Sequence, residues 1–76
     1  MLEIKRTLNT ERLTKARLVD LRPDEVITAF CAPDAAAWKT AERIAYNVKK
    51  DYSRPDGRQY VVASSAANMT VTVSLI

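Results

Sequence analysis

The longest regular pattern in this 76-residue chain lies at residues 34–52, which read DAAAWKTAERIAYNVKKDY. Apolar side chains recur there at intervals of three and four residues, the spacing that lines up one face of an α-helix. The members of this seam are Trp38, Ala41, Ala45, Val48 and Tyr52. Asp34 is a favourable N-cap, and the alanines after it have the highest helix propensity. The sequence therefore predicts an amphipathic helix from about residue 34 to residue 52.

Shorter runs of β-forming residues lie on both sides of this helix. Residues 26–31, VITAFC, are apolar and β-branched, which is typical of a buried strand. After the helix, a loop at 53–58 contains the only glycine of the chain, and two further β-rich runs follow at 59–64 and 69–76. The short segment between these two runs predicts a hairpin.

The N-terminal third gives a less decisive pattern. Residues 2–8 alternate in the manner of a short strand, whereas residues 11–21 fit a helix and a strand equally well. For the second segment we favour a short helix or an irregular turn, followed by a turn at residues 21–25. Together these elements predict a single α+β domain over residues 1–76. Its main helix packs on a small antiparallel sheet that ends in a C-terminal hairpin.

The residue types that the chain lacks exclude most active sites. It has no histidine, one cysteine and one glycine. It therefore cannot form a Ser-His-Asp or Cys-His pair, a zinc site of His and Cys ligands, or a glycine-rich phosphate loop. We expect no catalysis, no metal, no cofactor and no small-molecule substrate. The single Cys31 cannot form an internal disulfide, which favours the cytoplasm, and no apolar run approaches the ~20 residues of a membrane span.

Charge is distributed unevenly along the chain. Residues 1–38 carry equal numbers of basic and acidic side chains, residues 39–58 carry an excess of basic ones, and residues 59–76 carry no charged side chain. The net charge of +3 therefore comes entirely from the middle segment, which includes most of the predicted helix.

The basic residues of that helix form a stripe opposite the apolar seam. At about 100° per residue, Lys39, Arg43, Tyr46 and Lys50 fall on one line. Lys and Arg hold phosphates, a tyrosine can stack on a base, and an asparagine can read an adenine edge in a major groove. The candidate nucleic-acid contacts are Lys39, Arg43, Tyr46, Asn47 and Lys50 on the helix, with Arg54 and Arg58 in the loop. The alternative is that this stripe is the solvated face that any amphipathic helix needs.

The uncharged run at 59–76 is the second informative feature. Edge strands are normally protected by charged side chains, and this run has none. We expect a homodimer formed through residues 59–76, or pairing with a strand of another protein, unless both strands lie inside the sheet. Trp38, on the apolar seam, is expected in the core rather than at an interface.

A further indication comes from the order of short motifs over residues 18–76. The motifs are L-x-x-L-R-P-D-E-V-I-T-A-F, a helix rich in Ala and Arg, then YVVA and VTVSLI. This layout resembles small proteins of phages and mobile elements that have a strand–helix–strand–strand pattern and are often presumed to bind DNA. A Gly-Asp or Gly-Glu pair commonly opens their first strand, and Pro23-Asp24-Glu25 stands in its place here. The resemblance concerns layout and carries no functional residues across.

The features above favour a small, non-catalytic protein that binds nucleic acid, with double-stranded DNA as the expected target and an accessory or regulatory role. The rival hypothesis is a protein-interaction module or inhibitor that uses an exposed strand edge or a helix face. Strong loss of binding with salt distinguishes the first hypothesis, because neutralised phosphates release their counterions.

Overall fold

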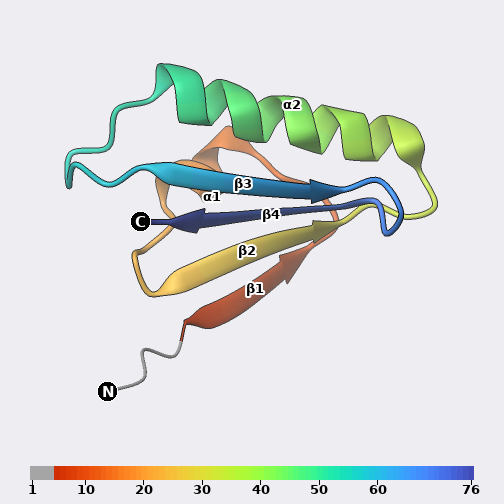
Figure 1. Cartoon of the computed structure of the whole chain (residues 1–76), viewed down its shortest axis with the longest axis horizontal. Helices are drawn as coiled ribbons and strands as arrows, with labels where there is room; N and C mark the ends of the chain where they lie inside the picture. The colour runs from red at the N-terminus through yellow and green to blue at the C-terminus, as the bar shows by residue number, and fades with distance from the viewer. Residues whose placement is uncertain (1–4) are drawn as a thin grey trace.

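The computed structural model describes residues 5–76, which form an α+β domain with one long helix (Figure 1). The elements are β1 (Arg6–Thr10), α1 (Lys15–Val19), β2 (Glu25–Phe30), α2 (Ala35–Asp51), β3 (Tyr60–Ser65) and β4 (Thr70–Leu75). The predicted main helix and C-terminal hairpin are confirmed. Asp34 caps α2 as expected, since its carboxylate accepts the backbone N–H groups of Ala36 and Ala37 at 3.0 and 3.1 Å.

The four strands form one mixed sheet in the order β1-β2-β4-β3. β2 pairs with β4 and β4 with β3 in antiparallel fashion, but β1 runs parallel to β2. The prediction of an antiparallel sheet is therefore wrong for β1. The reason is the connection: α1 carries the chain back from the end of β1 to the start of β2, so both strands point the same way.

The first strand lies slightly later in the chain than the sequence predicted. The expected strand at 2–8 appears as Arg6–Thr10, and residues 2–4 lie outside the described part. The ambiguous segment at 11–21 contains the short α1, as favoured. Its N-cap is Thr14, whose hydroxyl accepts the Arg17 N–H at 3.3 Å.

The core lies between α2 and one face of the sheet. Val71, Val73 and Leu75 of β4 are at most 1% exposed and alternate with partly exposed Thr and Ser residues on the other face. Ala41, Ala45 and Val48 of α2 face this core, as the seam predicted. The prediction that Trp38 lies in the core is only partly correct. Trp38 packs against the core but is half-buried, and its indole N–H donates to the Thr70 carbonyl at 3.2 Å.

The sheet has helices on one face only, because α1 packs beside α2. The resulting slab measures 36 × 30 × 16 Å. The face away from α2 is formed by alternate residues of each strand and includes the exposed side chains of Phe30 and Val61. No helix in the described residues is long and apolar enough to span a bilayer.

Candidate nucleic-acid interface

The outer face of α2 carries cations that have no acidic partner. Lys39, Arg43 and Lys50 are all exposed, on the side of the helix opposite the buried seam. Within residues 5–76 the only ion pair shorter than 4 Å joins Arg54 to Asp56. The three stripe cations are thus free to reach an external anion. We call Lys39, Arg43 and Lys50 the cationic crest.

The crest is long enough to contact both walls of a DNA groove. Lys39 and Lys50 are eleven positions apart, about 16 Å along the axis at ~1.5 Å per residue. The major groove is about 12 Å wide, and a helix with its side chains fills that width. Cations near the two ends of α2 can therefore meet phosphates of opposite strands while the middle of the helix faces the bases.

Tyr46 and Asn47 occupy the middle of α2 but point in different directions. Tyr46 is 46% exposed and continues the crest. Asn47 is exposed on the flank toward α1, where it lines a shallow hollow with Lys15 and Asp51. The structure therefore brings Tyr46 to the crest and sets Asn47 to one side of it.

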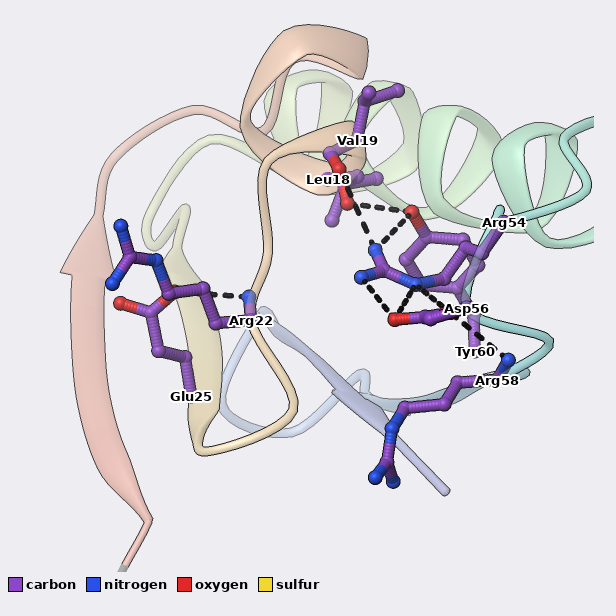
Figure 2. A network of polar contacts seen from close by, with 8 residues as sticks. All are labelled: Leu18, Val19, Arg22, Glu25, Arg54, Asp56, Arg58 and Tyr60. Atoms are coloured by element: carbon purple, nitrogen blue, oxygen red, sulfur yellow. Dashed lines mark hydrogen bonds and ion pairs between the residues drawn. The ribbon is translucent and has the colours of Figure 1, made fainter.

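Arg54 does not extend the crest into the loop. Its side chain is only 8% exposed and pairs with the Asp56 carboxylate, with Nη2 to Oδ2 at 2.9 Å and Nε to Oδ1 at 3.1 Å. The same guanidinium donates to the Tyr60 hydroxyl at 3.2 Å and lies over the Tyr60 ring (Figure 2). The expectation that Arg54 reaches phosphates is corrected, because these internal contacts hold the group inside the fold.

Tyr60 connects this cluster to the helical layer. Its hydroxyl donates to the Leu18 carbonyl at the short distance of 2.6 Å, joining β3 to α1 (Figure 2). The hydroxyl oxygen thus accepts from Arg54 while it donates to Leu18. The Arg54 hydrogen bond, followed by the one from the Arg58 backbone N–H, holds the pKa of Asp56 below its usual value. We call Arg54, Asp56 and Tyr60 the loop cluster.

Arg58 behaves differently from Arg54 although both belong to the same loop. Only its backbone N–H contacts Asp56, at 3.0 Å, and its exposed side chain extends away from the loop cluster (Figure 2). Arg58 therefore remains available to an external anion, and its contact with nucleic acid stays a prediction.

A hollow of about 440 Å³ lies between the C-terminal end of α2 and the following loop. No acidic side chain among residues 5–76 lines it. Its lining includes three exposed cations and two neutral hydrogen-bonding side chains: Lys49, Lys50, Arg58, Ser53 and Gln59. This lining suits an anion such as a phosphate group. Lys49, Ser53 and Gln59 were not among the predicted contacts, although the basic excess of residues 39–58 is the signal that points to this end of the helix.

The remaining described residues show no arrangement typical of a metal site or of a reactive thiol. No group of three His, Cys, Asp or Glu residues there could hold a metal ion. Cys31 is buried with its thiol 3.8 Å from the Glu11 carbonyl, and burial, then the charge of Asp34, raises its pKa. A buried thiol with a raised pKa is a poor nucleophile at neutral pH.

Comparison with known proteins adds no further identification. No protein-family model, curated protein or solved structure matches this chain. The layout resemblance to phage and mobile-element proteins accordingly stays a prediction.

Proposed function

We propose that this protein is a small, non-catalytic DNA-binding factor of the phage or mobile-element type, acting in the cytoplasm as an accessory or regulatory protein. The observation that carries the proposal is the cationic crest on α2, which continues at the helix end into a hollow lined by Lys50 and Arg58. None of these cations has an acidic partner within 4 Å among residues 5–76.

In the proposed complex, the outer face of α2 lies along a duplex. Lys39 and Arg43 contact phosphates near the start of the helix, and Lys50 with the hollow contacts a phosphate near its end. Tyr46 lies between these contacts, toward the bases. Binding by about four cations predicts that log K falls with log salt concentration with a slope near −3 to −4, at about −0.9 per phosphate.

The decisive experiment measures fluorescence anisotropy of a labelled duplex at two salt concentrations, with single-stranded DNA of the same length for comparison. The test variant is K39E/R43E/K50E. Its matched control is R12E/R17E/R22E, which makes the same change of net charge at three exposed arginines off the crest. We expect the test variant to lose duplex binding and the control to retain most of it.

Two results would count against the proposal. Unchanged affinity in K39E/R43E/K50E removes the crest as the site. Equal loss in both triple variants attributes binding to net charge rather than to α2. Circular dichroism accompanies each measurement, and exposed substitutions of this kind are expected to change stability by at most about 0.5 kcal/mol each.

The second candidate function is a protein-interaction module or inhibitor. It is favoured by the uncharged, six-residue β3 at the border of the sheet, where an extended segment of another protein can pair. Such binding depends on main-chain hydrogen bonds and is insensitive to salt, so the same two salt concentrations separate it from phosphate binding.

A further inference from the structure

β3 is an open edge of the sheet, whereas β4 is not. The order β1-β2-β4-β3 places β4 between two partners, so residues 70–73 have no free strand edge. The expected dimer through 59–76 is therefore corrected to β3 alone for edge pairing. A lysine at Val73, in β4, would disrupt a core position that is 0% exposed rather than an interface.

The hydrogen-bonding groups that β3 leaves free follow from its pairing with β4. Gln59 and Ile76 exchange both main-chain hydrogen bonds, at 3.1 and 3.4 Å. Because exchanging pairs alternate along an antiparallel ladder, Val61, Ala63 and Ser65 also direct their N–H and C=O groups toward β4. The groups of the alternate residues, Tyr60, Val62 and Ser64, point away from the sheet. No hydrogen bond within residues 5–76 occupies them.

The edge lacks the usual devices against pairing. Natural edge strands carry lysines, prolines or bulges, and β3, YVVASS, has none of these. The opposite edge differs. β1 begins with the exposed, charged Arg6. The β1 edge of the sheet therefore carries a charged side chain, whereas the β3 edge carries none.

We infer that a second copy of this chain pairs with β3 in antiparallel fashion about a two-fold axis at Val62. In this register Val62 lies opposite Val62 of the second copy, and Tyr60 lies opposite Ser64 of the second copy. All three residues with free main-chain groups then exchange hydrogen bonds, about six in total across the axis. The two sheets become one continuous eight-stranded sheet.

The side of α2 that lies above β3 matches the same side of α2 in the second copy across this axis. Trp38 contacts Thr70, the partner of Ser65, and Tyr52 packs 6.5 Å from Tyr60, so the middle of α2 lies level with Val62. α2 packs over β3 and β4, so with strands about 4.8 Å apart the two helices lie roughly 10 Å from each other, a normal packing distance.

The charges on this flank are opposite in the two halves of the helix. Glu42 and Lys49 lie on the β3 side of α2 by the helical period, four residues before and three after Tyr46. The two-fold axis therefore brings Glu42 of one copy to Lys49 of the other, twice. Val61 is 38% exposed, and it approaches the second copy on the other face of the sheet.

These features favour a second copy over an unrelated strand. An unrelated partner requires only the free main-chain groups, whereas Glu42 and Lys49 match the same surface of a second copy turned by a half-turn. The cationic crest points away from the axis, so the copies do not repel each other. This inference does not depend on DNA binding, and it places two crests side by side on one surface.

The test is analytical ultracentrifugation of the full chain without DNA, from about 1 to 100 µM. We expect a species of twice 8.5 kDa. E42K and K49E are each expected to weaken the dimer roughly three- to tenfold, because two exposed ion pairs become like-charge contacts. The swapped variant E42K/K49E restores the opposite charges across the axis and is expected to recover the wild-type dissociation constant.

V62P supplies a second, independent test. Proline removes the free N–H at the axis and leaves the bonds of β3 to β4 intact, so it is expected to yield a folded monomer. A single species near 8.5 kDa in the wild-type chain at 100 µM overturns the inference. Additive weakening in the swapped variant overturns the proposed register. Duplex binding is measured separately, so failure of dimerisation and failure of DNA binding are distinguishable.

Discussion

The cationic crest and the loop cluster each contain an arginine, but one arginine is exposed to solvent and the other is held inside the fold. On α2, Arg43 is exposed and makes no ion pair with any of residues 5–76, so its charge is available to a ligand. In the loop, Arg54 has 8% of its side chain exposed and contacts a carboxylate, a hydroxyl and the Val19 carbonyl. What separates the two arginines is the acceptors around them rather than their distance along the chain.

A tight turn assembles the loop cluster. The Arg54 carbonyl accepts the Gly57 N–H at 3.1 Å, and Gly57 has φ of +74°, which favours glycine. This turn brings the Asp56 carboxylate back onto the Arg54 guanidinium. The cluster then closes the end of the core where α2 has finished, and Tyr60 bridges to α1 beneath it.

The largest expected effect comes from removing Tyr60. Tyr60 is 3% exposed, and Y60A is predicted to lower the free energy of unfolding by about 3–5 kcal/mol, because it creates a cavity and removes the hydrogen bonds of the hydroxyl with the Leu18 carbonyl and Arg54. Y60F keeps the ring and loses only the hydroxyl, for which about 1–2 kcal/mol is expected. Urea denaturation measures both. An unchanged midpoint in Y60F would show that the 2.6 Å hydrogen bond to Leu18 contributes nothing.

The pair R54M and R58M tests the comparison directly. R54M removes the donor to Asp56, Tyr60 and Val19 and is predicted to cost about 1–3 kcal/mol of stability. R58M is predicted to leave stability within about 0.5 kcal/mol of wild type while it weakens duplex binding. Urea denaturation and anisotropy on the same two proteins give both numbers. The opposite pattern would mean that Arg54 serves a ligand and Arg58 the fold.

The sequence predicted the regular elements well and the loop poorly, for a physical reason. The periodicity and the Asp34 cap are local signals, and they located α2 to within one residue at each end. The direction of β1 and the role of Arg54 depend on contacts distant in sequence. The Arg54 contact with Val19 spans 35 residues, and no sequence pattern inside the loop predicts it. The crest could be predicted because exposure on a helix follows its period.

The acid dependence of stability should include a contribution from the loop cluster. The folded-state pKa of Asp56 is lowered, first by the Arg54 hydrogen bond, so the ionised carboxylate stabilises the fold above the unfolded pKa near 3.8. That contribution is lost as pH falls through the lower folded-state value. D56N is predicted to flatten the fall in urea midpoint below about pH 4. An identical acid limb in D56N would assign the acid sensitivity to other carboxylates.

The smallest effect expected on stability is at the crest, where R43A should change the free energy of unfolding by no more than about 0.5 kcal/mol. Its effect belongs to the salt dependence of DNA binding. Removing one phosphate contact should reduce the slope of log K against log salt by about one, and it should do so for every duplex sequence. Anisotropy titrations between about 50 and 200 mM salt measure that slope. The control is R17A on α1, which is exposed but off the crest and is expected to leave the slope unchanged. If R43A and R17A gave the same slope, the crest would not differ from the rest of the basic surface. The difference between the exposed crest cations and the internally bonded Arg54 would then concern only the stability of the fold.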